Sequence, residues 1–215
     1  MKAKKRSLKV KSRARPPAGS AEQILTAALA EFAEHGLAGA RVDRIAALSG
    51  VNKAMIYYHF GSKENLYDQC IKQVMNRIVG FFEEAATTEP DPEEFVRKVT
   101  VFYHSLFDRA GDFRPIFLRE LASGSERLKA AFTATFSDRG LQKKMKALID
   151  KGKRSGMFRN VDTIQAIISF IGMNVFYLIA APVINDVWEI KDEKKFKKKR
   201  QKEVADLFLY GLKAR

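Results

Sequence analysis

The fold is decided by the stretch RIAALSGVNKAMIYYHFGSKENLY, residues 44–67 of the chain. Apolar residues recur at helical spacing in its first part, which predicts a helix of about two turns over Val42–Ser49. Gly50 then permits a tight turn in which a larger residue would clash. Asn52 is a good N-cap, so we expect a second short helix over Lys53–Phe60.

The second of these helices has an open face that suits a DNA groove. Ile56 and Phe60 lie four residues apart and are expected to face inward. The open side then holds Lys53, Ala54, Met55, Tyr57 and Tyr58. Free amides at a helix N-terminus favour phosphate, a lysine can bind a phosphate or a guanine edge, and tyrosine hydroxyls can donate to phosphates. Lys63, at the start of the next helix, is placed for a flanking phosphate. These residues indicate a helix-turn-helix that reads DNA.

Residues 44–67 resemble the signature of the TetR family of one-component repressors around its helices 2 to 4. The preceding AEQILTAALAEFAEHGLAGARV, residues 21–42, resembles helix 1 of that family and the linker that follows it. The resemblance covers residues 20–74, and the string IYYHFGSKENL within it is specific to the family rather than to helix-turn-helix motifs in general.

The resemblance implies which residues contact DNA. They are Arg41, Val42, Asn52, Lys53, Ala54, Met55, Tyr57, Tyr58, His59 and Lys63. Arg41 and Asn52 stand where the family often has Thr or Ser. Asn52 remains a competent helix cap, whereas Arg41 is a poorer cap that could gain a phosphate contact. His59 matches the motif histidine of the family.

Most of the remaining chain also has helical patterns, and no segment shows a convincing alternating strand pattern. Ser20 and Gln23 form a capping box, so a first helix is expected to begin at Ser20 and to end at Gly36. Asp91 and Pro92 predict an N-cap and a first helical residue. The later helices are expected over residues 63–84, 91–109, 114–123, 126–154, 163–184 and 194–212. The predicted fold class is therefore all-α.

We expect three regions along the chain. Residues 1–18 are basic and lack apolar periodicity, which predicts a disordered basic arm. The resemblance implies a three-helix, helix-turn-helix DNA-binding head over residues 19–65 and an antiparallel helical effector-binding and dimerisation body over residues 66–215. It also implies a ligand-responsive repressor that binds a pseudopalindromic operator as a homodimer, with the helix over residues 63–84 as the lever between head and body.

The charge of the chain favours a polyanionic partner. The net charge is +14, and residues 1–15 carry eight lysines and arginines with no acidic residue. A second basic cluster runs through residues 191–202. Nucleic acid or an anionic membrane surface would suit such an excess, and solvated ends that bind nothing remain the alternative. One hypothesis is that residues 1–15 act as an arm that follows phosphates or enters a minor groove.

The expected body is rich in aromatic residues and methionines. Any one of them is most simply a core residue, but a pocket lined by several would suit a small, largely apolar effector. The candidate pocket residues are Phe102, Tyr103, His104, Phe107, Phe113, Phe117, Phe136, Met145, Phe170, Met173, Asn174 and Tyr177. Among polar side chains, the candidate anchors for that effector are His104, Arg114, Arg119 and Asn174.

Residues 163–184 form a segment that is nearly long and apolar enough to cross a bilayer. Gln165 and Asn174 inside it are costly in lipid but can be paired in a helix bundle, so burial in a core or a dimer interface is favoured and no membrane is expected. The expected interface residues are Ile168, Ile171, Val175, Leu178, Ile179, Val204, Leu207 and Phe208. Two alternatives remain open: a membrane-associated helical protein, or a TetR-like regulator whose body binds a protein.

Enzyme, metal and disulfide chemistry find little support in the sequence. The one cysteine, Cys70, allows no disulfide within the chain and suits a reducing cytoplasm. None of His35, His59 and His104 accompanies a nucleophile motif or a metal-binding motif. No apolar stretch of a secretory signal follows the basic residues before Pro16. We therefore expect a cytoplasmic protein that is not an enzyme and uses no cofactor and no metal.

Overall fold

A computed structural model describes residues 19–88, 91–106, 113–137 and 139–214 of the chain. Its elements are all helical: α1 Ser20–Gly39, α2 Val42–Ser49, α3 Lys53–Phe60, α4 Lys63–Thr88, α5 Pro92–Leu106, α6 Arg114–Ala122, α7 Glu126–Phe132, the π-helix η1 Thr133–Ser137, α8 Leu141–Arg154, α9 Thr163–Val187 and α10 Glu193–Leu212. One isolated β-bridge joins Phe158 to Lys213. The prediction of an all-α fold is confirmed for the described residues.

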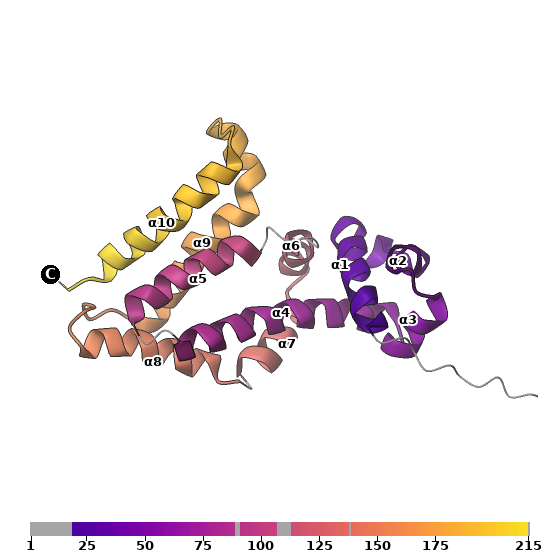
Figure 1. Cartoon of the computed structure of the whole chain (residues 1–215), viewed down its shortest axis with the longest axis horizontal. Helices are drawn as coiled ribbons and strands as arrows, with labels where there is room; N and C mark the ends of the chain where they lie inside the picture. The colour runs from indigo at the N-terminus through magenta and orange to yellow at the C-terminus, as the bar shows by residue number, and fades with distance from the viewer. Residues whose placement is uncertain (1–18, 89–90, 107–112, 138, 215) are drawn as a thin grey trace, which may run out of the picture.

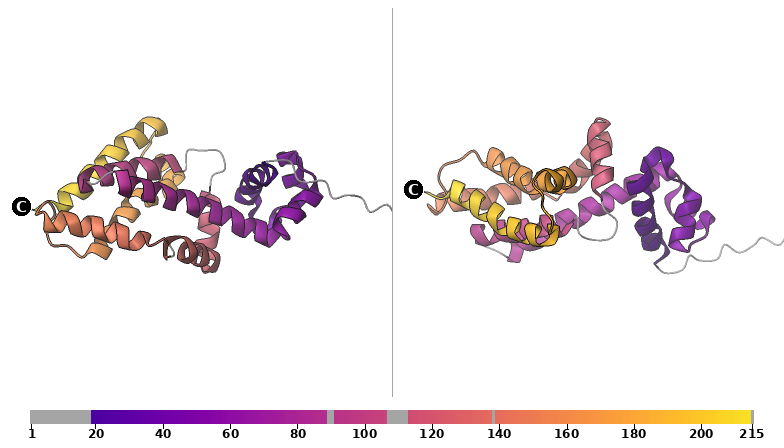
Figure 2. Two further views of the ribbon diagram at one scale, coloured as in Figure 1. Left: turned by 60° about the horizontal axis from the view of Figure 1, so that its bottom comes forward. Right: turned by 90° about the horizontal axis from the view of Figure 1, so that it is seen from above.

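The helices form a small head and a larger body. Helices α1 to α3 make the head, and α4 runs out of it into the body formed by α5 to α10 (Figure 1). The further views show the same separation, with α9 and α10 forming an antiparallel hairpin along one side of the body (Figure 2). The predicted arrangement of a helix-turn-helix head before a helical body is confirmed, and α4 crosses the boundary that was placed after residue 65.

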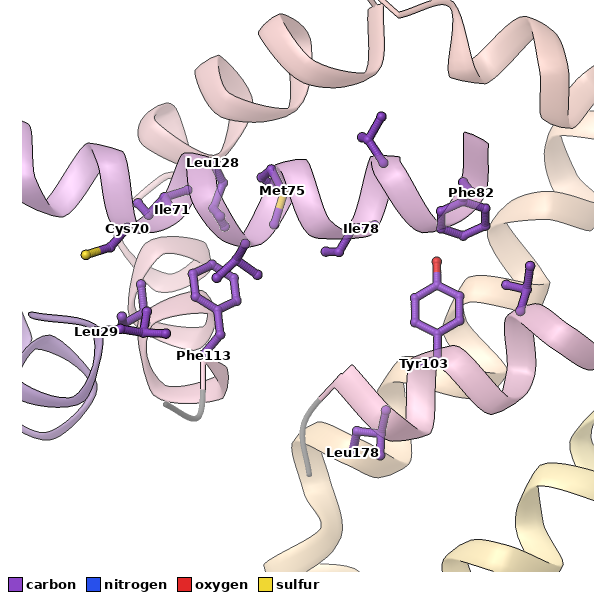
Figure 3. Packing of buried hydrophobic residues seen from close by; sticks show 14 of the residues in the cluster. Leu29, Cys70, Ile71, Met75, Ile78, Phe82, Tyr103, Phe113, Leu128 and Leu178 are labelled. Carbon is purple, nitrogen blue, oxygen red and sulfur yellow. The ribbon is translucent and has the colours of Figure 1, made fainter. Parts of the chain in front are cut away.

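The hydrophobic core follows α4 from the head into the body. Cys70 and Ile71 lie near the head end of α4, whereas Phe82 lies near Tyr103 of α5 in the body (Figure 3). The rings of Phe82 and Tyr103 have centroids 6.0 Å apart and are nearly perpendicular, at 68°. Edge-to-face contact of this kind is a favourable arrangement of aromatic rings. Head and body therefore share one continuous apolar core through α4.

Several helix ends follow the sequence cues. Helices α2 and α3 have the predicted bounds. Asp91 accepts a hydrogen bond from the Glu93 N–H at 3.1 Å, and Pro92 is the first residue of α5. Helices α4, α9 and α10 are slightly longer than predicted. The predicted end of α5 at residue 109 and the predicted arm over residues 1–18 lie outside the described residues.

The capping box at Ser20 is wrong. Gly19 precedes α1 in a left-handed conformation with φ of 86°, and no side-chain cap is present. Ser20 is instead the first residue of α1, is buried, and its Oγ lies 2.8 Å from Nε2 of His59. The hydroxyl is engaged by a distant part of the chain, which the local sequence pattern does not reveal. Gly36 does interrupt α1 as expected, with φ of 66°, but the helix resumes as far as Gly39.

The single helix expected over residues 126–154 is also wrong. Helix α7 ends at Phe132, the π-helical turn η1 follows, and α8 begins only at Leu141. Gly140 precedes α8 with a left-handed φ of 63°, a conformation that glycine adopts without steric cost. The Thr135 hydroxyl donates to the Ala131 carbonyl at 2.6 Å, and a threonine bonded in this way competes with the regular backbone ladder.

Candidate nucleic-acid interface

Local backbone chemistry positions the recognition helix α3. Gly50 ends α2 in a left-handed conformation with φ of 67°, which turns the chain. Asn52 then accepts a hydrogen bond from the Ala54 N–H at 2.9 Å and caps α3 as predicted. Ile56 is 2% exposed and anchors α3 on the core of the head, while Phe60 is partly buried. One side of α3 is therefore fixed and the other faces solvent.

The open side of α3 carries most of the residues that were expected to read DNA. Tyr57 and Tyr58 are 45% and 59% exposed, large values for aromatic side chains. Lys53 and Ala54 are also exposed, and Met55 is partly buried. The structure thus leaves two phenol groups, one cation and one small side chain exposed on one short helix.

Lys53 is paired within the head. Its Nζ lies 2.8 Å from Oδ1 of Asp43 on α2, and this hydrogen bond raises the pKa of Lys53 above its ordinary value. Both side chains are exposed, so water screens the pair and its net free energy is small. A phosphate can therefore replace Asp43 as the partner of Lys53 at little cost.

At the start of α2, one residue that was predicted to contact DNA is exposed and the other is buried. Arg41 is exposed and precedes α2 without a side-chain cap, so its guanidinium is available. Val42 is only 8% exposed and belongs to the core of the head. The side chain of Val42 cannot reach DNA without leaving that core, so we remove it from the expected contacts.

Two further predicted contact residues lie at joints of the head. Lys63 donates from Nζ to the Ala40 carbonyl at 3.3 Å, which ties the start of α4 to the end of α1. His59 is partly buried and joins α3 to Ser20 at the start of α1. Its ring also meets the Tyr58 ring edge to face at 5.4 Å. In this structure His59 thus fixes α3 on α1, and Lys63 fixes α4 on the end of α1.

The sequence reasoning missed a buried carboxylate beneath this surface. Glu31 on α1 is 3% exposed and its Oε1 accepts hydrogen bonds from the Arg41 N–H at 2.9 Å and from Nε of Arg44 at 2.7 Å. Burial alone would raise the pKa of Glu31, but the Arg41 amide and the Arg44 guanidinium hold it below its ordinary value. A glutamate beside the apolar positions of α1 was the available clue. This network fixes how α2 leaves α1.

A second missed feature ties the body to the head. Nη1 of Arg119 on α6 donates to the carbonyls of Phe32 at 3.0 Å and Ala33 at 2.7 Å, and Nη2 donates to Glu34 at 3.2 Å. The interruption of α1 at Gly36 leaves carbonyls in the turn before it in need of donors, and a cation is favourable at such an end. Arg119 was expected to anchor an effector; the structure corrects this, because its guanidinium binds the head.

The predicted pocket residues are spread through the body. Tyr103, His104, Phe113, Phe170, Asn174 and Tyr177 are buried, whereas Phe102, Phe117, Phe136, Met145 and Met173 are partly buried. Phe107 lies outside the described residues. Phe102 stacks on Phe81 at 3.7 Å and Phe170 packs against Phe208 at 4.7 Å, as core residues do. Among the described concavities, Phe102, Met173 and Tyr177 each line a different one.

Two of the predicted polar anchors face the inside of the body. Asn174 is fully buried, and its Nδ2 donates to the Phe170 carbonyl at 2.8 Å. Its Oδ1 has no hydrogen-bond partner among the described residues. His104 on α5 is fully buried as well. Arg114 donates to the Leu178 carbonyl at 3.4 Å and so connects α6 with α9. In the part of the chain that the structure describes, no group of three or more His, Cys, Asp or Glu side chains could hold a metal ion.

The predicted interface residues on α9 and α10 fall into two groups. Ile168 and Leu207 are 58% and 67% exposed, and Ile171, Val175 and Ile179 are partly buried. Leu178, Val204 and Phe208 are buried within the subunit, which corrects their assignment to a contact with a second copy. The sequence reasoning missed exposed apolar residues on α9, namely Ile164, Phe176, Val183 and Val187. With Ile168 these four define the α9 stripe, and its helical spacing was the clue.

Helix α9 is, by length and composition, the one described helix that could cross a membrane. It spans Thr163–Val187 with a mean hydropathy of 2.1 in its most apolar window. Only 28% of that window is buried inside the subunit. The opposite side of the helix is packed into the body through Phe170, Asn174 and Tyr177. The exposed apolar side is therefore a stripe rather than the whole circumference.

Both parts of the chain match known families. Residues 24–70 match the model of the bacterial regulatory proteins of the tetR family, and residues 92–207 match the tetracyclin repressor-like C-terminal domain. The chain is 30% identical over 144 residues to the HTH-type transcriptional repressor NicS of Pseudomonas putida, which covers 65% of this chain and 66% of that protein. It is 47% identical over 62 residues to the HTH-type transcriptional repressor SCO4008 of Streptomyces coelicolor, which covers 29% and 32%. The matches thus span less than two thirds of these relatives.

The fold is also similar to that of solved regulators. The fatty acid degradation regulator FadR of Bacillus halodurans aligns with a TM-score of 0.71 at 24% identity, over 94% of this chain and all of that chain. At this identity the likeness establishes the fold, a helix-turn-helix head followed by a helical body. The same order of head and body is the one seen in Figure 1.

Proposed function

Because the chain belongs to the TetR family of bacterial regulatory proteins, we propose that it is a homodimeric transcriptional repressor that binds a pseudopalindromic operator and responds to a small ligand. The observation that carries the proposal is the open face of α3, where Lys53, Tyr57 and Tyr58 are exposed on a helix capped by Asn52. Such a regulator acts in the cytoplasm, where its operator lies.

The chemistry of the head suits the major groove. The amides at the start of α3 and the Lys53 ammonium favour phosphates, while the Tyr57 and Tyr58 hydroxyls can donate to the backbone of the duplex. Ala54 is small enough to approach a thymine methyl group. In a dimer, two such helices would enter successive major grooves about 34–36 Å apart, which is why a pseudopalindrome is expected.

The α9 stripe supports the dimer. Ile164, Ile168 and Val183 are more than half exposed, which leaves a continuous apolar surface in the single subunit. Surfaces of this kind mark interfaces, and two copies of an α9–α10 hairpin can bury theirs in a four-helix bundle. A helix that spans a membrane would instead need apolar side chains on every side that the rest of the protein does not cover. The one-sided stripe therefore favours a second copy over a membrane.

The body supports a ligand that is apolar with a few polar groups. Its interior is dense in aromatic side chains, and Asn174 keeps a buried carbonyl oxygen that no described residue satisfies. Buried polar atoms usually have partners, so a ligand that donates a hydrogen bond to Oδ1 of Asn174 would be stabilised there. Arg114 links α9 to α6 and Arg119 links α6 to the head, so two hydrogen bonds through α6 connect α9 with α1.

Operator selection from random DNA, followed by gel-shift titration, tests the proposal. The double variant Lys53→Ala with Tyr58→Phe should lose at least about tenfold in operator affinity, because two phosphate or base contacts disappear. Lys72→Ala, which removes an exposed cation of α4 outside the head surface, should bind like the wild type. Circular dichroism and dimer mass should not change in either variant. Wild-type affinity in the double variant, or no selected sequence at all, would contradict the proposal.

A further inference from the structure

A concave site lies between the ends of α9 and α10, near the turn that joins them (Figure 1). Its volume is about 520 Å³, within the usual range of small-molecule sites. Aromatic side chains form most of its wall: Phe176, Tyr177, Trp188 and Phe196. The rings of Tyr177 and Phe196 pack together at 5.2 Å and form a continuous surface. Arg200 of α10 is the one charged residue that lines this site.

Arg200 has hydrogen-bonding capacity that the protein does not use. Its Nη2 donates to the Met173 carbonyl at 2.9 Å, and its guanidinium carbon lies 5.1 Å from the centroid of the Tyr177 ring. These two contacts hold the side chain against the wall. Its Nε is buried and has no hydrogen-bond partner among the described residues. A buried donor without an acceptor is costly, so a carboxylate that draws the guanidinium toward it and accepts from Nε would be stabilised here.

The two acidic residues at the start of α10 are engaged within that helix. Glu193 forms an ion pair with Lys197 at 2.7 Å, and Asp192 accepts the Lys195 N–H at 2.8 Å as the cap of α10. No carboxylate of the described residues is paired with Arg200. The wall thus combines an apolar surface with one cation for which the described residues provide no ion pair.

We propose that this site binds a small carboxylic acid with an apolar body, its carboxylate paired with Arg200 and its hydrocarbon part packed on the aromatic wall. A guanidinium presents donors in a planar fork that matches the two oxygens of a carboxylate. The aromatic rings offer apolar area to the remainder of the ligand. This site is separate from the head, and the proposal does not depend on operator binding.

A second copy of the chain is the competing occupant. Phe176 belongs both to the wall of the site and to the α9 stripe, so a partner subunit packed on that stripe would lie close by. The free donor of Arg200 favours an anion over an apolar helix surface, because apolar packing alone leaves that donor unsatisfied. The experiment below separates the two occupants.

The chain contains a single tryptophan, Trp188, and it stands in the wall of the site. It is 75% exposed, so its emission should shift to shorter wavelength when an apolar ligand covers it. We would titrate the full chain with octanoate and, separately, with 1-octanol, which has the same hydrocarbon chain without the charge. Octanoate should bind at least about tenfold more tightly than octanol, because only octanoate carries a charge and two oxygens that can pair with the guanidinium.

Variants of Arg200 test whether this residue causes the difference in affinity between octanoate and octanol. Arg200→Gln should weaken octanoate binding at least about tenfold and leave octanol binding unchanged, while Arg200→Lys should fall between because a lysine lacks the planar fork. Arg97→Gln is the matched control, since Arg97 is a body arginine already paired with Asp206 at 2.7 Å, and it should titrate like the wild type. Circular dichroism establishes that each variant is folded.

Sedimentation velocity on the same samples measures the dimer mass and so tests whether a second copy of the chain occupies the site. If Arg200→Gln lowers the dimer mass while octanoate leaves the Trp188 emission unchanged in the wild type, a second copy covers the site and the proposal is overturned. Equal affinities for octanoate and octanol, or equal octanoate affinities in the wild type and in Arg200→Gln, overturn it as well. Operator gel shifts remain a separate measurement, so failure here would leave the regulator proposal standing.

Discussion

Glu31 holds the turn between α1 and α2 through one buried oxygen. That oxygen accepts the Arg41 N–H and Nε of Arg44, and Arg44 also donates from Nη2 to the Gly39 carbonyl at 3.1 Å. A buried acceptor that serves two donors is expensive to remove, because both donors then lose their partner. The position of α2 within the head thus depends on a buried residue of α1.

Glu31→Gln should destabilise the protein by about 1–3 kcal/mol at pH 7, since the charged hydrogen bonds become neutral ones. The pKa of Glu31 is held below its ordinary value of 4.5, so its contribution is present above that value and is lost as the pH falls through the folded-state pKa. Thermal unfolding at a series of pH values checks this. The gap between wild type and variant should close in acid, whereas Glu203→Gln, at an exposed position inside α10, should show no gap. A gap that is constant with pH would count against the assignment.

Residue 152 of α8 must be a glycine, because the ring of Phe158 lies against it. A Cβ at this position would lie 2.9 Å from Cγ of Phe158 and closer still to two other ring atoms, and Phe158 is only 3% exposed. Gly152→Ala should therefore lower stability by about 1–3 kcal/mol, as overpacking of a core does. Gly80→Ala is the control, because a Cβ there meets nothing within 4 Å and alanine favours a helix by about 1 kcal/mol. Opposite shifts of the melting temperature are expected, and equal shifts would be inconsistent with the close approach.

At the scale of elements, the sequence predicts best where the determinant is local. The bounds of α2 and α3 follow from Gly50 and Asn52, whose effects act within one turn of the chain. The break between α7 and α8 was missed because the apolar pattern continues across it while the backbone turns at Gly140. The cap predicted at Ser20 was wrong because its hydroxyl bonds His59, 39 residues away. Local cues cannot report partners that only the tertiary fold brings together.

In the candidate DNA-binding site, too, local cues predict some residues and miss those that depend on tertiary contacts. Lys53, Tyr57 and Tyr58 were predicted to be exposed because their positions on α3 follow from the helical period and from the resemblance. Val42 could not be placed by either argument, since it lies at the first position of α2 and its burial depends on how α1 packs. Arg119 had no cue at all, because its carbonyl partners lie some 85–87 positions earlier in the chain.

Arg119 joins two elements that must move together if the body is to control the head. Arg119→Ala removes the donors for three carbonyls at the end of the regular part of α1, so that end should exchange its amide hydrogens faster and operator affinity should fall about tenfold. Arg139→Ala is the control, because Arg139 bonds Glu83 and Asn76 within the body. Hydrogen exchange and gel shift on the same samples decide the matter. Faster exchange with unchanged operator affinity would assign Arg119 to stability alone.

At the scale of the whole molecule, the subunit leaves its most apolar helix half uncovered. Ile168 belongs to the α9 stripe and is 58% exposed, while the other side of α9 is packed in the body. An exposed apolar surface of this extent needs a partner in water. The proposed pseudopalindromic operator needs two heads, so the proposal requires the stripe and α3 to act together in one assembly.

Ile168→Glu should therefore convert the dimer into a monomer, because it places two like charges near the symmetry axis of an apolar interface. The monomer should remain folded, since Ile168 contributes little to the core of its own subunit. Operator affinity should fall by more than a hundredfold when only one head can bind at a time.

Val101→Glu is the matched control, because Val101 is 52% exposed on α5, away from the stripe. Sedimentation equilibrium gives the mass and gel shift gives the affinity. A dimer of Ile168→Glu with unchanged operator affinity would place the contact between subunits elsewhere, whereas a monomer that still binds the full operator tightly would separate DNA recognition from dimerisation.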